Sequence, residues 1–109
     1  MNITEEQIER AIFYLRDSAS NYAFWRGRMM ATEYLIKQKE AAEFLFVESG
    51  TQETRKSKAR TSEAYKQAVN EHEEAIIKYT EIQSKRKAAE TLISAWQSYV
   101  KGNGQGLNI

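Results

Sequence analysis

The chain has 109 residues, of which 28% are charged, and its formal net charge at pH 7 is +1. This length predicts a single domain, and the near-neutral charge excludes a global field that would draw the protein onto nucleic acid or an anionic membrane. The absence of cysteine excludes disulfide bonds, a thiolate nucleophile and a cysteine-ligated zinc site. There is no proline and no apolar run long enough to span a membrane, so we expect a cytoplasmic, all-α protein that does not associate with membranes.

The first predicted element is a long helix from about residue 5 to residue 47. Thr4 and Gln7 fit a capping box at its start. The polar stretch 17–21 is the place where a break would fold the first turns back as a third helix. We favour a continuous helix, because no proline or glycine interrupts that stretch. Gly50 is expected to end the helix in the left-handed conformation.

One apolar stripe along this first helix is predicted to face a partner helix. From Leu15 to Ala19 and from Ala19 to Ala23 the spacing is four residues twice in succession, a stutter that locally relaxes a supercoil. The stripe comprises Ile8, Ile12, Leu15, Ala19, Tyr22, Ala23, Gly27, Met30, Tyr34, Ala41 and Leu45.

The connection between residues 50 and 61 is polar, and Thr51 is suited to cap a short helical segment within it. The connection carries four basic residues within six positions, at what we expect to be a loop tip. Lys and Arg side chains there can reach phosphates without distorting the helices, so we predict contact with nucleic acid or an acidic partner. The predicted binding residues are Arg55, Lys56, Lys58 and Arg60.

The second long helix is predicted from Ser62, a suitable N-cap, over residues 63–101. Eleven of its positions keep an unbroken three-four spacing, and nine of these are apolar or aromatic; they are Tyr65, Ala68, His72, Ala75, Tyr79, Ile82, Arg86, Ala89, Ile93, Trp96 and Val100. Such a seam faces another helix along its whole length, either in the first half of the chain or in a second copy.

The two helices therefore predict a long antiparallel helical hairpin with a polar, partly helical connection. The chain has more apolar side chains than one seam needs, which favours self-association into an oligomeric helical bundle. The self-association seam would use Tyr65, His72, Tyr79, Ile82, Ile93 and Trp96. Residues 1–101 would form one helical domain, and residues 102–109, which alternate glycine with polar residues up to Gly106, would form a flexible tail.

Two polar residues interrupt the seam of the second helix. His72 is the only histidine, so we expect a hydrogen-bonded structural residue in preference to a metal ligand or a general base. Arg86 either extends to water or pairs with a carboxylate across the interface. We favour the pairing, which would fix the register of the helices.

Two Glu-x-x-Glu pairs offer an enzymatic alternative. Glu40 and Glu43 lie late in the first helix, and Glu71 and Glu74 lie early in the second, so a hairpin would bring the two regions near each other. Four carboxylates can hold magnesium. This arrangement resembles the all-helical nucleotide pyrophosphohydrolases of the MazG and dimeric dUTPase type, although that family's second pair ends in Asp where this chain has Glu74.

A broader resemblance spans about residues 13–100. The aromatic first helix runs into Lys37–Ala41 and is followed by Gly50 and the charged stretch 53–60. The later matching segments are Ser62–Tyr65, Lys85–Glu90 and Ala95–Ser98. In this order of features the chain resembles small all-helical proteins of tailed bacteriophages, encoded among early recombination genes. The resemblance implies a phage protein acting in the host cytoplasm on DNA replication, recombination or host interference, and it supplies no catalytic residues.

Together these patterns predict a non-enzymatic binding or scaffold protein without cofactors, working as an accessory to phage DNA recombination or repair. The expected partners are a second copy of the chain, single-stranded DNA, or a phage recombination or host protein. The first alternative is an inhibitor that binds a host defence or nuclease complex through exposed aromatics such as Trp25. The second is a magnesium-dependent pyrophosphohydrolase that uses the four glutamates.

Overall fold

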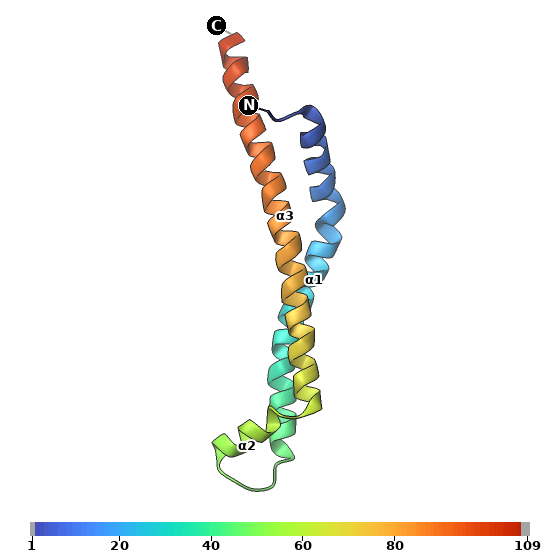
Figure 1. Cartoon of the computed structure of the whole chain (residues 1–109), viewed down its shortest axis with the longest axis vertical. Coiled ribbons are helices and arrows are strands. Elements are labelled where there is room, and N and C mark those ends of the chain that lie inside the picture. The colour runs from blue at the N-terminus through green and yellow to red at the C-terminus, as the bar shows by residue number, and fades with distance from the viewer. Residues whose placement is uncertain (1, 108–109) are drawn as a thin grey trace. The chain divides into compact units, whose positions relative to one another are not determined.

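The computed structural model describes residues 2–107, with side chains placed for residues 2–102. Within this range the chain forms three helices and no strand: α1 (Glu5–Leu45), α2 (Gln52–Ala59) and α3 (Glu63–Leu107). Figure 1 shows α1 and α3 running in opposite directions, with α2 between the end of α1 and the start of α3. The predicted helical hairpin is therefore confirmed. None of the described helices is long and apolar enough to cross a bilayer.

The contacts divide the hairpin into two compact units. The central unit is Ala23–Tyr79, which contains the second half of α1, all of α2 and the first half of α3. The terminal unit combines the chain up to Tyr22 with the chain from Thr80 onwards. Each unit therefore has its own stretch of α1 packed on α3.

The starts of all three helices use the caps that the sequence predicts. The Thr4 amide donates to Gln7 Oε1 at 2.9 Å, and the Gln7 amide donates to Thr4 Oγ1 at 3.2 Å, which completes the capping box. The Thr51 hydroxyl accepts from the Thr54 amide at the start of α2. The Ser62 hydroxyl accepts from the Tyr65 amide at 3.1 Å at the start of α3.

The ends of the long helices differ from the prediction. α1 ends at Leu45, so Gly50 lies beyond its last turn; Gly50 does have a positive φ of 114°, but in the loop that leads to α2. α3 continues to Leu107, six residues past the predicted end at Lys101, so Gly102 lies inside the helix. The predicted flexibility of residues 102–109 stays a prediction, and residues 108–109 lie outside the described residues.

The seam predicted on α3 is the face that packs on α1. Ten of its eleven positions are buried or half-buried, and only Val100 is exposed. Three of them, Ala68, Ala75 and Ala89, are buried alanines, whose small side chains let the two helices approach closely. The residues that we assigned to self-association thus make contacts within the chain.

The contact face of α1 is not the predicted stripe. The observed face keeps its own three-four spacing without a stutter, and all nine positions are buried or half-buried: Ile8, Ala11, Leu15, Ser18, Tyr22, Trp25, Met29, Thr32 and Ile36. Eight of the eleven predicted positions are exposed, namely Ile12, Ala19, Ala23, Gly27, Met30, Tyr34, Ala41 and Leu45. The predicted stripe left out Trp25, Met29 and Ile36, and it also left out the small or polar residues Ala11, Ser18 and Thr32 that belong to the observed face.

Ser18 and Thr32 of α1 lie opposite the two polar seam residues of α3, Arg86 and His72. In the terminal unit, the Arg86 guanidinium donates to the Leu15 carbonyl at 2.7 Å and to the Ser18 hydroxyl at 2.8 Å, and it lies over the Tyr22 ring. Arg86 therefore does cross the interface, but its partners are a carbonyl, a hydroxyl and a ring, and not the carboxylate that we expected. Ser18 is buried at this contact, and the stretch 17–21 is helical within the continuous α1, as predicted.

In the central unit, His72 bonds the buried Thr32. Thr32 Oγ1 lies 2.8 Å from His72 Nδ1 and 2.7 Å from the Arg28 carbonyl. A carbonyl only accepts, so a hydroxyl bonded to both groups donates to Arg28 and accepts from the Nδ1–H of His72. This geometry confirms the structural role predicted for His72. The two polar layers pin the register of α1 against α3, one in each unit, because a shifted register would leave buried polar groups without partners.

Candidate binding surface on α2

The four predicted basic residues fall into two groups on α2 and its C-cap. Arg55 points back toward the end of α1, where it donates to the Val47 carbonyl at 3.0 Å and to the Phe44 carbonyl at 3.4 Å. Its guanidinium also lies 4.2 Å from the centre of the Phe44 ring. The Phe44 carbonyl also accepts from the Val47 amide, so Arg55 adds a second donor there, and it supplies a side-chain donor to the Val47 carbonyl in the loop after α1. Arg55 therefore anchors α2 to α1.

Arg60 makes a second connection between these elements. Its guanidinium lies 3.2 Å from Glu40 Oε1, and the side chain of Glu40 is mostly covered. Arg60 itself remains more than half exposed, so the ion pair leaves part of its surface open. The pair, together with the buried Ala59, holds the C-terminal end of α2 against α1.

Lys56 and Lys58 form the second group. Both side chains are exposed, and within the described part of the chain neither ammonium group takes part in a hydrogen bond or an ion pair. Since Arg55 and Arg60 fix the helix from which they project, the two lysines are presented on an anchored support. They are the cations of α2 that remain available to an anionic partner.

A groove of about 310 Å³ lies beside these lysines in the central unit, between α1 and α2. Ala41 and Phe44 supply apolar surface, Lys37 and Lys56 supply positive charge, and the remaining lining residues are Glu40 and Gln52. An apolar surface with lysines beside it suits a ligand that has a flat or aliphatic part and a negatively charged part. The sequence analysis missed Lys37, Phe44 and Gln52. Only the observed path of α2 back along α1 brings these three residues together.

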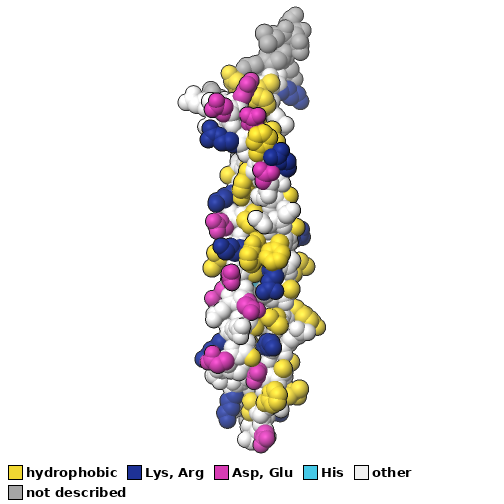
Figure 2. All heavy atoms as spheres, turned by 90° about the vertical axis from the view of Figure 1, so that its right-hand side faces the viewer, with side chains coloured by type: hydrophobic (Ala, Val, Ile, Leu, Met, Phe, Trp, Pro, Cys, Tyr) yellow, Lys and Arg dark blue, Asp and Glu magenta, His cyan; other side chains and the backbone are white. Residues whose placement is uncertain are grey.

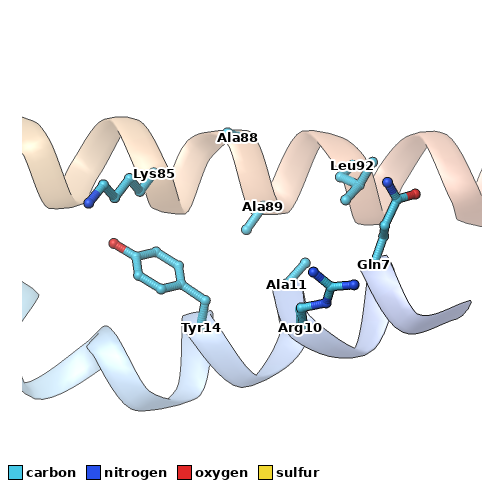
Figure 3. Close-up of a pocket in the computed structure, with 8 residues that line it drawn as sticks. All are labelled: Gln7, Arg10, Ala11, Tyr14, Lys85, Ala88, Ala89 and Leu92. Atoms are coloured by element: carbon cyan, nitrogen blue, oxygen red, sulfur yellow. The ribbon is translucent and has the colours of Figure 1, made fainter. Parts of the chain in front are cut away.

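A second groove, of about 400 Å³, lies in the terminal unit (Figure 3). The groove is open where small side chains line it, namely Ala11 of α1 and Ala88 and Ala89 of α3. Tyr14 of α1 points across the groove toward α3. Its charged lining residues are engaged locally, because Arg10 pairs with Glu6 and Lys85 with Glu81. We interpret this groove as space left by packed alanines.

The carboxylates of the enzymatic alternative do not form a metal site in the described part of the chain. Thr32 lies opposite His72, and α1 and α3 run antiparallel. Glu40, eight residues after Thr32, therefore lies near Ala64, eight residues before His72. Ala64 is roughly 10 Å along α3 from Glu71. Glu40 is paired with Arg60, and Glu71 lies 3.9 Å from Arg28. No group of three or more His, Cys, Asp or Glu side chains among the described residues is arranged to hold a metal ion. Glu43 is half-buried and Glu74 is exposed, and neither completes such a group.

One other predicted feature has surroundings different from those expected. Trp25 is half-buried on the contact face of α1, with its ring edge-on to Phe24 at 5.0 Å, so it is not the exposed aromatic on which the inhibitor alternative depended. At the surface, Arg16 is hydrogen-bonded to Asp17, which holds the pKa of the Asp17 carboxyl below its ordinary value. That pair lies outside the α2 surface.

Comparison of the chain with protein-family models, with curated proteins and with solved structures found no match.

Proposed function

We propose that the protein acts by binding, without catalysis, and that the anchored helix α2 presents Lys56 and Lys58 to the phosphates of single-stranded DNA. The observation that supports this proposal is that the four basic residues have two different roles. Arg55 and Arg60 are engaged in holding α2 to α1, while the ammonium groups of Lys56 and Lys58 are exposed and lack partners in the described part of the chain.

The groove next to α2 supports an unpaired strand as the ligand. A phosphate backbone needs cations at intervals, which Lys37, Lys56 and Lys58 supply. An unpaired base has an apolar face that packs on aromatic and aliphatic surface, which Phe44 and Ala41 supply in the same groove. A duplex hides its base faces, so the groove favours single strands. The resemblance to phage recombination proteins gives the biological setting that we propose, an accessory role in DNA recombination or repair.

Fluorescence anisotropy with a labelled oligothymidine, measured across a salt series, tests the proposal. We expect binding that weakens steeply with salt. The double variant Lys56→Gln/Lys58→Gln removes two phosphate contacts, so the slope of log K against log salt should fall by about 1.4, since each contact on a single strand contributes about 0.7.

The matched control removes two lysines from α3 in the same unit. Lys66 and Lys78 are exposed, and neither ammonium group has a partner in the described part of the chain. The variant Lys66→Gln/Lys78→Gln has the same net charge as the test variant, so it should bind almost as well as the natural chain. Equal losses in the two variants would indicate general charge attraction and would contradict a site on α2.

A further inference from the structure

The outward face of α1 in the central unit is uncharged over three turns. The six residues on it, Ala23, Phe24, Gly27, Met30, Ala31 and Tyr34, lie within about 120° of one another around the helix, at 100° per residue. All six are exposed, including Phe24 at 57%, Met30 at 62% and Tyr34 at 64%. Figure 2 shows hydrophobic and charged side chains interspersed over the face of the molecule that it presents. We call these six residues the outer α1 face.

Gly27 is the second unusual feature of this face. It lies in the middle of a 41-residue helix, where glycine is less favourable than alanine. Nothing within the chain requires it, because its φ is not positive and a Cβ built there would meet no atom within 4 Å. A glycine at such a position permits close approach by another backbone.

Two charges beside the outer α1 face, Arg26 and Glu33, suit a second copy of the chain as the partner. Arg26 and Glu33 are seven residues apart on the same flank, and neither side chain forms an ion pair in the described part of the chain. When two copies of one helix pack antiparallel, like flanks meet like flanks. A two-fold axis between residues 29 and 30 then brings Arg26 of each copy beside the partner's Glu33, and Phe24 beside the partner's Tyr34.

We propose that two copies of the chain associate through the outer α1 faces, antiparallel, about a two-fold axis close to Met30. Gly27 lies less than one helical turn from this axis. Because it has no side chain there, the α1 backbones of the two copies can come close together. The interface does not include the α3 seam or the lysines of α2, so self-association and DNA binding can succeed or fail separately.

Sedimentation of the natural chain over a wide concentration series is the first measurement, with a monomer–dimer equilibrium as the expected result. Gly27→Leu should raise the dimer dissociation constant at least tenfold while leaving helicity and thermal midpoint undiminished, because the space around Gly27 is empty within one chain. This variant separates loss of association from loss of folding.

A charge swap tests the antiparallel geometry. Arg26→Glu and Glu33→Arg should each weaken the dimer, because each leaves two like-charged contacts at the interface. The double variant should recover most of the affinity, because the exchanged charges meet again across the axis. Lys78→Glu, a charge reversal on α3, should leave association unchanged.

Cross-linking locates the axis, since the natural chain contains no cysteine. A cysteine introduced by Met30→Cys should form an intermolecular disulfide on mild oxidation, whereas Ile77→Cys, at an exposed position of α3, should not. A chain that stays monomeric at every concentration would overturn the proposal, and the outer α1 face would then belong to a different partner. So would a dimer that tolerates Gly27→Leu, or one that the double charge swap does not restore.

Discussion

Individual polar residues define how the two long helices align. Thr32 is only 1% exposed, yet its hydroxyl is fully used, between the Arg28 carbonyl and the ring of His72. In the other unit Ser18 and Arg86 form the equivalent layer. Apolar side chains alone tolerate a shifted register, because one alanine or isoleucine can replace another. A buried hydrogen bond between particular residues does not allow this exchange.

Thr32→Val tests the layer in the central unit. The change keeps the side-chain volume but removes the hydroxyl, so the Nδ1–H of His72 loses its acceptor and the free energy of unfolding should fall by about 1–3 kcal/mol. Urea denaturation at a low protein concentration measures this loss. Adding His72→Leu removes the orphaned donor as well and should recover much of the stability. If the double variant were less stable than the single variant, the hydrogen bond would not be the origin of the effect.

The same scale shows what the sequence could reveal about the candidate site. The basic run was visible in the sequence, but its four residues have different roles in the structure. Arg55 and Arg60 bind within the chain because α2 turns back along α1, and no local pattern predicts that path. The contribution of Lys37 and Phe44 was missed for the same reason: both lie far from the basic run in sequence.

At the scale of the elements, the contact face of α3 could be predicted from the sequence, whereas that of α1 could not. On α3 most seam positions carry large apolar residues or alanine, so spacing alone identified the face. On α1 the real seam contains Ser18 and Thr32, while Met30, Tyr34 and Leu45 are exposed. An apolar stripe therefore misled the prediction on α1, because part of the apolar surface of that helix does not face α3.

The attachment of α2 to α1 depends on Arg55. Arg55→Ala removes two hydrogen bonds to carbonyls at the end of α1 and the contact with the Phe44 ring, so the free energy of unfolding should fall by about 1–2 kcal/mol. Lys56→Ala, one residue further along the same helix, should change it by less than about 0.5 kcal/mol. Thermal unfolding followed by circular dichroism compares the two. A larger loss for Lys56→Ala would contradict the assignment of Arg55 as the anchor.

The turn before α2 depends on Gly50. Its φ of 114° is a conformation that L side chains rarely adopt, and a Cβ there would lie 3.4 Å from Thr54 Cγ2. Gly50→Ala should therefore destabilise the chain by about 1–3 kcal/mol. Gly102→Ala is the control: it lies within α3 with open space around it, so alanine there should stabilise by about 0.5–1 kcal/mol. Chemical denaturation measures both, and effects of the same sign would contradict this assignment.

For the molecule as a whole, the two proposals use different surfaces. The α3 seam packs on α1 within each chain, so our proposal for self-association uses a different surface. We propose the outer α1 face for self-association and α2 for an anionic ligand. The all-α hairpin was predictable because length, absence of proline and heptad spacing all indicate it. The division of its surfaces was not, because it depends on which face of α1 is covered.

Amide chemical-shift mapping during titration of the isotope-labelled chain with oligothymidine is the most direct test of the proposed function. The account predicts that the largest changes fall on α2 around Lys56 and Lys58 and on the neighbouring groove residues Lys37 and Phe44, and that they reverse on adding salt. Changes centred on α3 near Lys66 and Lys78, or no changes at DNA concentrations well above that of the protein, would contradict it.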